Sequence, residues 1–348
     1  MKKNQINYKS SGVDIDKANE AKKEMAIILE AGKNNARILN KVGAFASLID
    51  GNFPQLRHPV LVMKTEEPGS KQKLAFQYGK IESICFDMIN HLINDIIVMG
   101  ASPIAVQDAI ICGKLEKEVI SKLVASLSKA CTLQGCSLIG GETSEQPGVL
   151  KEGEYILTSS IIGVVDKNFI IDGSKITIED DIIAISSNGP HTNGYSLIRA
   201  LINDDPSILK AMIEGESFLE LIMKPHVCYY NALKEILTWE GLHGLAHITG
   251  GGIKENLNRI LPNSINALIN LNSISVLPVF KFIKQQAELE ERELLRTFNC
   301  GVGMIVVCNK KITKNIIKHI GAKNLHAYII GETILGNKEV EYKGSLSL

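Results

Sequence analysis

Segments with the apolar spacing of helices alternate along this chain with short apolar runs of strand length. Residues 115–134 repeat apolar side chains at helical intervals before Gly135, and residues 16–31 are predicted to form a helix that begins after Asp14 or Asp16 and stops at Gly32. Asp181 to Ser186 is instead a short run of β-type residues. The same patterns predict strands at 59–64, expected to be buried, 155–165, 266–271 and 301–308, and helices at 195–203, 225–238 and 253–260. Such an alternation favours an α/β or α+β arrangement of layered helices and sheets.

The length of the chain, 348 residues, exceeds what one hydrophobic core usually organises. A prior of roughly 100–200 residues per domain therefore predicts two domains. A turn at Asp172-Gly173-Ser174 precedes the strand at 181–186, and we place the boundary just before this turn. The expected domains are residues 1–168 and 169–348, with polar residues 203–220 forming a surface loop and a short helix.

Charge and cysteine content argue against several classes of protein. The 38 basic residues equal the 38 acidic residues, so no net charge draws the chain to nucleic acid or an anionic membrane. The seven cysteines include no Cys-x-x-Cys pair, which favours reduced thiols over a zinc site or a disulfide framework. No run of about 18 apolar residues occurs, and no apolar segment follows the N-terminal lysines. We therefore expect a cytoplasmic protein with neither a nucleic acid nor a membrane partner.

The segment from Asp87 to Met99 has the pattern of an amphipathic helix. Its apolar residues fall on one side, and Asp87, His91 and Asp95 recur at intervals of four on the other. Carboxylate oxygens arrayed in this way could hold Mg²⁺ against nucleotide phosphates. A solvated helix face explains the same spacing, and the spacing alone favours that explanation.

Two further segments place glycine beside charged residues directly after an apolar run. In Thr65 to Lys71, backbone N–H groups and the lysine ammonium could surround a phosphate, although the Pro-Gly pair by itself favours a solvated turn. In the second segment, Gly140 and Gly141 would let the backbone approach a ligand, and Glu142 could bind metal or act as an acid or base. A tight hairpin explains this glycine pair equally well.

Two histidine-bearing loops are the strongest local signals of function. The loop from Asn188 to Ser196 lies between a predicted strand and a predicted helix, so free N–H groups at the helix start suit a phosphate. Histidine is suited to proton exchange near neutral pH, and a histidine buried in the core would rarely occur in so polar a loop, so we favour a functional interpretation of His191. His247 precedes Gly250-Gly251-Gly252 at the start of another predicted helix, where three glycines indicate a closely approaching anion.

Taken in chain order, these segments resemble aminoimidazole ribonucleotide (AIR) synthetase, also called phosphoribosylformylglycinamidine cyclo-ligase, of purine biosynthesis. The similar segments are Tyr8–Ile15, Asn94-Asp95, Asp95–Pro103 with the pattern Asp-x4-Gly-Ala-x-Pro, Gly140–Thr143, Pro190–Ser196, His247–Gly252 and Arg296–Met304. These segments are distributed along nearly the whole chain, from Tyr8 to Met304. The Asp-x4-Gly-Ala-x-Pro element is shared with related ATP-using enzymes of hydrogenase maturation, selenophosphate and thiamine phosphate metabolism, whereas the last three segments are more particular to the cyclo-ligases.

The resemblance implies a two-domain α/β (α+β) fold, with an N-terminal sheet that pairs across a homodimer, a C-terminal α/β domain and an active site in the cleft. It implies that ATP and Mg²⁺ activate the amide oxygen of formylglycinamidine ribonucleotide, a small phosphorylated substrate, so that a nitrogen can close the imidazole ring. The residues implied are His191, His247 and Asp95 for catalysis; Gly69, Ser70, Lys71, Asn94, Gly140, Gly141 and Glu142 for ATP; Asn193, Gly194, Tyr195, Gly250, Gly251, Gly252 and Asn256 for the substrate; and Asp95, Glu142 and Glu66 for Mg²⁺.

The chain departs from the family pattern in two places. Glu66-Glu67-Pro68 stands where the family usually has Asp-Gly-Val, and Ala26 lies in the first helix near the position where many members carry a lysine. Two alternatives therefore accompany the cyclo-ligase: a paralogue that binds nucleotide or substrate with altered or lost turnover, and a sister ATP-dependent kinase or synthetase. The sister enzymes should lack Pro190–Ser196 and Arg296–Met304 in this form.

Overall fold

The computed structural model describes residues 15–33 and 37–348, so most of the similar segment Tyr8–Ile15 lies outside the described residues. The chain divides into two compact units. The first unit contains residues up to Leu56, Met63–Leu92 and Pro103–Val164, and the second contains Arg57–Val62, Ile93–Ser102 and Val165–Leu348. Because the two units exchange short segments, the boundary after residue 168 stays a prediction.

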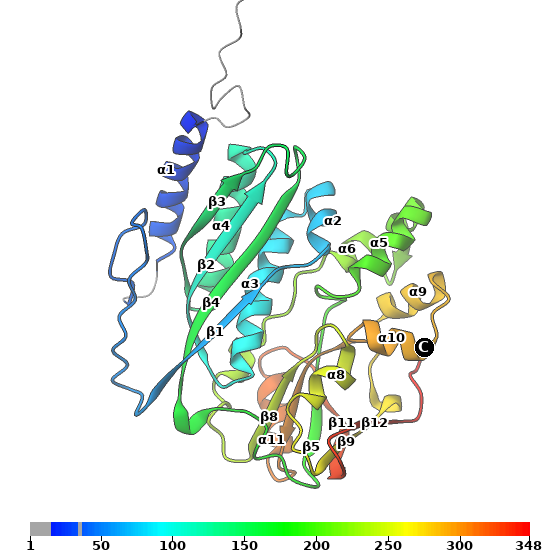
Figure 1. Cartoon of the computed structure of the whole chain (residues 1–348). Helices are drawn as coiled ribbons and strands as arrows, with labels where there is room; N and C mark the ends of the chain where they lie inside the picture. The colour runs from blue at the N-terminus through cyan, green and yellow to red at the C-terminus, as the bar shows by residue number, and fades with distance from the viewer. Residues whose placement is uncertain (1–14, 34–36) are drawn as a thin grey trace, which may run out of the picture. The chain divides into compact units, whose positions relative to one another are not determined.

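A sheet with helices on one face forms the first unit (Figure 1). The strand order is β1-β4-β2-β3, and β2 and β3 run parallel. The elements are β1 (Pro59–Glu66), β2 (Ser102–Cys112), β3 (Ser137–Glu145), β4 (Tyr155–Asp166), α1 (Ile15–Ala31), α2 (Lys71–Gln77), α3 (Ile81–Ile97) and α4 (Lys117–Leu133). The apolar side chains that repeat along α3 and α4, such as Ile89 and Leu127, are buried in the core. The predicted helices at 16–31 and 115–134 and the strand at 155–165 are confirmed.

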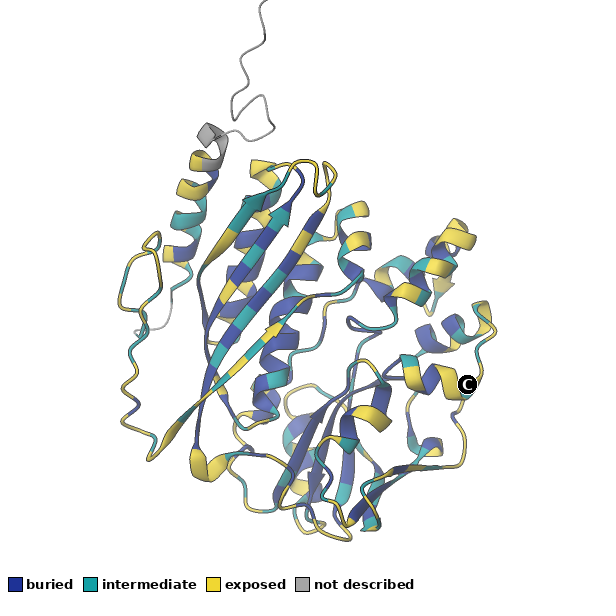
Figure 2. Ribbon diagram, viewed as in Figure 1, coloured by how far each residue is buried: buried dark blue, intermediate teal, exposed yellow. Residues whose placement is uncertain are grey.

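Strand β1 forms, but the prediction that it is buried is wrong. It is an edge strand whose residues alternate between exposed and intermediate (Figure 2). Leu61 and Met63 are exposed, at 56% and 74%. Only one neighbour covers an edge strand, and an unbroken apolar run does not reveal whether both of its faces are covered.

The polar side of α3 is also not the solvated surface that the spacing favoured. Asp87, Asn90 and His91 are buried. The carboxylate of Asp87 pairs with the ammonium of Lys71 at 2.7 Å, and both side chains are fully buried. Helical periodicity separates polar from apolar residues, but a polar side chain can be buried when a second polar partner meets it.

The second unit is built on a sheet with the strand order β12-β9-β11-β5-β10-β8. Its strands are β5 (Asp181–Ser186), β8 (Leu242–His247), β9 (Ile265–Asn270), β10 (Val302–Cys308), β11 (Ala327–Leu335) and β12 (Val340–Lys343). The neighbouring strands pair antiparallel except β12 and β9, which are parallel. Every residue of β10 is buried, and buried residues fill most of the sheet (Figure 2). The strand predicted at 181–186 is confirmed with both bounds, and β9 and β10 fall within one residue of prediction.

Helices and a small hairpin complete this unit. They are α5 (Tyr195–Asp204), α6 (Phe218–Ile222), α7 (Tyr230–Leu233), α8 (Gly252–Asn258), α9 (Pro278–Gln286), α10 (Glu291–Thr297), α11 (Thr313–Gly321) and the hairpin β6 (Met212–Ile213) with β7 (Glu216–Ser217). Of the helix predicted at 225–238 only α7 forms, because residues 224–229 are a loop without regular secondary structure. Within the residues that the structure describes, no helix combines the length and apolar character needed to cross a membrane.

Candidate active site

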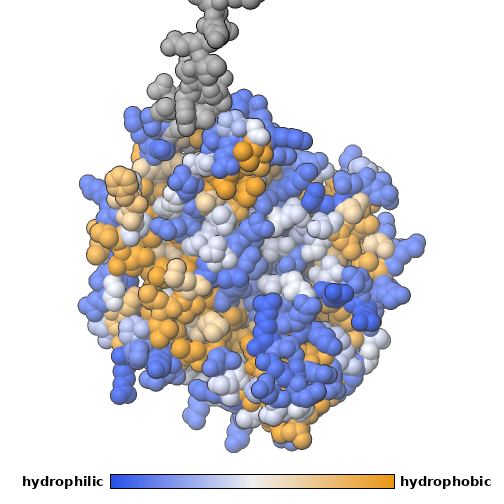
Figure 3. All heavy atoms as spheres, viewed as in Figure 1, coloured by the Kyte–Doolittle hydropathy of each residue, from blue (hydrophilic) through white to orange (hydrophobic). Residues whose placement is uncertain are grey.

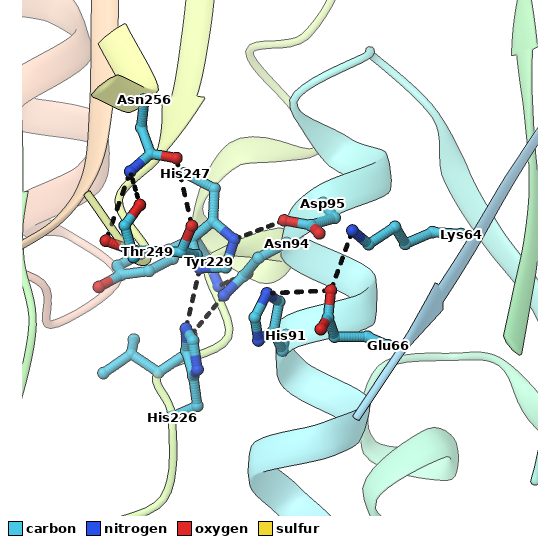
Figure 4. Close-up of polar contacts among 12 residues, drawn as sticks. Lys64, Glu66, His91, Asn94, Asp95, His226, Tyr229, His247, Thr249 and Asn256 are labelled. Carbon is cyan, nitrogen blue, oxygen red and sulfur yellow. Dashed lines mark hydrogen bonds and ion pairs between the residues drawn. The ribbon is translucent and has the colours of Figure 1, made fainter. Parts of the chain in front are cut away.

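Asp95, His247, His226 and His191 form a chain of contacts inside the second unit (Figure 4 labels the first three). The Nδ1 atom of His247 lies 2.7 Å from Oδ1 of Asp95, and its Nε2 atom lies 2.9 Å from Nε2 of His226. The ring of His226 stacks on that of His191 with centroids 3.8 Å apart. All three histidine side chains are buried. Imidazoles held at these distances have defined orientations, as groups that move protons require.

The two outer histidines are positioned by the central sheet. His247 is the last residue of β8 and pairs with Met304 of β10. Gly303, next to Met304, leaves room for the side chains of Tyr229 and His191. A Cβ at this position would lie 1.8 Å from Oη of Tyr229 and 2.9 Å from Cε1 of His191. His191 has a φ of 61°, a left-handed conformation that costs a non-glycine residue energy and occurs more often at functional sites.

Asn94, predicted to bind ATP, holds a loop of the second unit through its side-chain amide. Its amide nitrogen donates to the carbonyl of Val227 at 2.7 Å, and its amide oxygen accepts from the N–H of Tyr229 at 2.9 Å. Asn188 donates to the carbonyl of Pro225 at 2.9 Å. These contacts fix the loop that carries His226.

The two predicted substrate loops lie side by side. A Cβ on Gly250 would come within 3.3 Å of the Asn193 side-chain oxygen. The amide nitrogen of Asn193 is a buried donor with no hydrogen-bond partner among the described residues. It lies just before α5, whose first-turn N–H groups are an additional place for an anion.

Other residues predicted to bind substrate have structural partners. Tyr195 is buried and its hydroxyl donates to the carbonyl of Ile222. Asn256 donates to the carbonyls of Gly250 and Gly252 at 3.1 and 2.8 Å and so ties the turn to α8. Gly252 has a positive φ of 62°, and a Cβ there would lie 2.0 Å from the carbonyl of Leu295. Backbone packing therefore explains this glycine without a ligand.

A separate cavity of about 820 Å³ lies within the first unit. The predicted ATP residues Gly140, Gly141 and Glu142 line it. The other lining residues come from α1, the loop 40–47 and the strands: Lys22, Met25, Ala26, Leu29, Asn40, Lys41, Val42, Gly43, Ala44, Phe45, Ala46, Ser47, Thr65, Gln107, Asp108, Ala109, Ile139, Thr143, Thr158, Ser159 and Ser160. The glycine pair lies inside strand β3 rather than in a hairpin, so the hairpin alternative is wrong.

The wall of this cavity contains polar atoms without partners among the described residues. They are Oδ2 of Asp108, Oγ1 of Thr143 and Oγ of Ser159. Burial raises the pKa of Asp108 to about 7. Gly141 makes room for this carboxyl group, because a Cβ there would lie 2.1 Å from the Asp108 Oδ1 atom. Buried oxygens that lack partners are suited to a polar ligand.

The predicted residues of the 66–71 segment do not line the cavity. Lys71 starts α2, and burial lowers its pKa against the opposing effect of the paired Asp87 carboxylate. The Glu66 carboxylate lies 2.9 Å from the ammonium of Lys64 and 3.8 Å from His91 (Figure 4). Their predicted role in binding ATP together with Gly140 and Glu142 stays a prediction, and Thr65, next to Glu66, lines the cavity.

Sequence reasoning missed two residues of these sites. His226 lies in the segment predicted as helix 225–238, and Asp108 lies on β2, a strand that was not predicted. A histidine next to Pro225 was the only local signal for the first. For Asp108, a single carboxylate in the apolar run Ile104 to Cys112 was a signal of a buried acid.

Comparison with known proteins identifies the family. Residues 56–165 match the family described as AIR synthase related protein, N-terminal domain, and residues 177–343 match its C-terminal domain. The phosphoribosylformylglycinamidine cyclo-ligase of Nitrosococcus oceani is 36% identical over 331 residues, covering 94% of this chain and 92% of that protein. The corresponding protein of Bacillus mycoides is 38% identical over 333 residues, covering 95% and 96%. The chain belongs to the phosphoribosylformylglycinamidine cyclo-ligase family.

Solved structures agree on the fold. Hydrogenase maturation protein HypE in complex with ATP superposes with a TM-score of 0.65 at 16% identity, covering 90% of this chain and 88% of that one. The predicted fold class and family are therefore confirmed, and the family is one of ligases of purine biosynthesis. The cyclo-ligase prediction is thereby favoured over the sister kinase and the paralogue.

Proposed function

We propose that this chain catalyses the ATP-dependent closure of formylglycinamidine ribonucleotide to 5-aminoimidazole ribonucleotide. Family membership supports the reaction. The observation that carries the chemistry is the buried contact of 2.7 Å between His247 and Asp95, with His226 and His191 beside it. Imidazole exchanges protons near neutral pH, and a carboxylate on Nδ1 is a known way to orient it.

The reaction needs an amide oxygen that can leave and a nitrogen that can attack. Phosphorylation by ATP makes the oxygen a good leaving group, and the attacking nitrogen loses a proton as the ring closes. We assign proton transfer to His191 and His247. We assign Asp95 to orienting His247, since its Oδ1 atom contacts that ring, in place of its predicted role as a Mg²⁺ ligand.

We assign ATP to the cavity of the first unit. Its volume of about 820 Å³ suits a nucleotide, and Gly140 and Gly141 would let phosphates approach the backbone. Glu142 supplies a hard oxygen donor in the same wall, where several other oxygens lack partners, and this donor chemistry fits Mg²⁺. Glu142 would hold the ion, which when bound neutralises phosphate charge.

We assign the phosphate of the ribonucleotide to the loop before α5. Asn193 supports this assignment, because its buried amide nitrogen has no partner among the described residues. The first N–H groups of α5, from Tyr195 onward, would add donors to an anion at the helix start. Gly250 approaches Asn193 from the second loop and leaves space beside it.

We also propose that the chain forms a homodimer through the edge of the first sheet. Leu61 and Met63 on β1 are exposed, and apolar side chains gather on this side of the first unit (Figure 3). Exposed apolar patches of this kind mark interaction surfaces. Replacing Met63 by aspartate should shift the molecular mass measured by light scattering from dimer to monomer.

The purified protein, incubated with ATP, Mg²⁺ and formylglycinamidine ribonucleotide, tests the proposed reaction. We expect ADP and 5-aminoimidazole ribonucleotide in equal amounts. Formylglycinamide ribonucleotide, which has a carbonyl oxygen in place of the amidine =NH group and therefore a much less nucleophilic ring-closing nitrogen, is the matched control and should give no 5-aminoimidazole ribonucleotide. Binding of ATP and substrate without ring closure would favour the paralogue, and equal ATP consumption without any ribonucleotide would contradict the proposal.

A further inference from the structure

His226 occupies a central position among the buried groups of the second unit. Its Nε2 atom lies 2.9 Å from Nε2 of His247, and its ring stacks on His191 with centroids 3.8 Å apart and planes 24° apart. It is 1% exposed. In Figure 4 His226 lies below His247, and Asp95 lies to the right of His247. It therefore touches both histidines to which proton transfer is assigned.

The two contacts of His247 define its protonation pattern. A carboxylate can only accept, so Nδ1 of His247 must carry a hydrogen toward Asp95. A neutral His247 then has a bare Nε2 atom that can only accept. At 2.9 Å one hydrogen must lie between the two Nε2 atoms, so His226 must donate it. The pattern runs in one direction, from His226 through His247 to Asp95.

The backbone around His226 is held firmly enough to maintain this contact. On one side of His226, the side-chain amide of Asn188 donates to the carbonyl of Pro225. Asn94 bonds both Val227 and Tyr229 on the other side. The hydroxyl of Tyr229 in turn donates to the carbonyl of Ser186 on the central sheet at 3.0 Å. A loop fixed at both flanks can place one imidazole with the accuracy that a catalytic neighbour needs.

We propose that His226 is a positioning residue for the ring-closing reaction, and that it acts by donating its Nε2–H to His247. This donation keeps the proton of His247 on Nδ1 and holds its ring against Asp95, while the face of His226 supports the ring of His191. The inference rests on the proposed function of this site. It adds a residue and a fixed pair of tautomers to that function.

Two substitutions separate donation from simple packing. His226→Gln keeps an N–H donor near the position of Nε2, whereas His226→Leu keeps bulk and removes the donor. We expect kcat to fall on the order of 10²-fold in His226→Leu, the low end of what a placed acid–base group contributes. We expect His226→Gln to stay within about 10-fold of the unchanged protein, because it retains the hydrogen bond. KM for both substrates should change little, since neither variant alters a binding group.

His243→Leu is the matched control. His243 lies on the same strand as His247 and also contacts a carboxylate, Oδ2 of Asp180, at 2.6 Å. It belongs to no part of the proposed site. We expect this variant to lower the unfolding temperature and to leave kcat close to that of the unchanged protein. Equal losses of kcat in His226→Leu and His226→Gln, or no loss in either, would overturn the positioning role.

Nitrogen-15 NMR of the imidazoles tests the tautomers without any turnover. In the unchanged protein we expect His247 protonated on Nδ1 and His226 protonated on Nε2. A His247 ring protonated on Nε2 would overturn the inference even if the protein closes the ring. The protein could instead show the expected tautomers and fail to cyclise formylglycinamidine ribonucleotide. That result would support the hydrogen bond from His226 to His247 and contradict the proposed function.

Discussion

His247 in the second unit and the cavity wall of the first unit differ in whether their buried polar atoms have hydrogen-bond partners. In the histidine group, both ring nitrogens of His247 have partners, one on Asp95 and one on His226. In the cavity wall, Oδ2 of Asp108 and Oγ of Ser159 are buried with none among the described residues. Satisfied groups are oriented before a substrate arrives, whereas unsatisfied ones gain a partner when a ligand binds. Changes in the first region should therefore affect kcat, and changes in the second should affect stability and nucleotide KM.

The largest effect that this comparison predicts is on Asp95. Asp95→Asn keeps the size of the side chain and removes the charge that holds the proton on Nδ1 of His247. We expect kcat for ring closure to fall about 10²–10⁴-fold with little change in KM. Asp172→Asn, at an exposed turn aspartate whose partner is the N–H of Ser174, is the control. If a higher Mg²⁺ concentration restored full kcat to the Asp95→Asn variant, Asp95 would be a metal ligand rather than a group that orients His247.

The next effect is the pH dependence of stability caused by Asp108. Burial raises its pKa from 3.8 to about 7, so the folded state holds a proton that the unfolded state releases. The wild-type protein should lose stability as pH rises from about 4 to about 7, by an amount on the order of 4 kcal/mol at most. Asp108→Asn has no titrating group at position 108, so its unfolding free energy should not fall over this pH range. Urea unfolding at pH 4 and pH 8 measures it.

In that experiment the two proteins should differ little at pH 4 and most at pH 8, where the variant should be the more stable. Asp50→Asn, at a partly exposed position that contacts the backbone of Asn52, is the control and should show no such crossover. A variant that is equally destabilised at both pH values would mean that the carboxyl group has a partner in the cavity after all.

Local pattern was sufficient for much of the fold. The strand Asp181–Ser186 and the helices α4 and α8 were predictable because their signals, apolar spacing and a terminal glycine, lie within the element itself. The approach of the Asn193 loop to the turn at Gly250 was also within reach, since the resemblance marks both segments. These predictions needed no knowledge of what lies across the sheet.

The remaining features depend on contacts between residues far apart in sequence. The backbone on both sides of His226 is held by Asn94 and Asn188, so the segment 224–229 is a loop although its own spacing suggested a helix. Lys71 was predicted to meet phosphate, but burial beside Asp87 on the next helix gives it an internal partner. Sequence spacing shows which residues share a face and does not show what covers that face.

A smaller effect is expected where the backbone itself supports the histidines. Gly303→Ala would place a methyl group 1.8 Å from Oη of Tyr229 and 2.9 Å from Cε1 of His191. Relieving this overlap should cost about 1–3 kcal/mol of unfolding free energy and lower kcat as His191 moves. Gly321→Ala, where no atom lies within 4 Å, is the control and should be neutral in both measurements. Loss of stability with full kcat would show that Tyr229 alone adjusts.

The smallest effect should come from the loop that borders the cavity, and it should appear in KM alone. The hydroxyl of Ser47 donates to the carbonyl of Ile139 at 3.0 Å and ties the loop 40–47 to strand β3 beside Gly140. Ser47→Ala loses one hydrogen bond of about 0.5–1.5 kcal/mol, so KM for ATP should rise roughly 2–10-fold. The kcat should not change, because no group of the histidine region is touched. Thr132→Ala removes a hydroxyl that bonds the carbonyl of Ser128 away from the cavity, and it should leave KM unchanged. A fall in kcat without a rise in KM would mean that the loop 40–47 acts in the chemical step, as the histidines do. The proposed difference between the two regions, one affecting kcat and the other KM, would then be wrong.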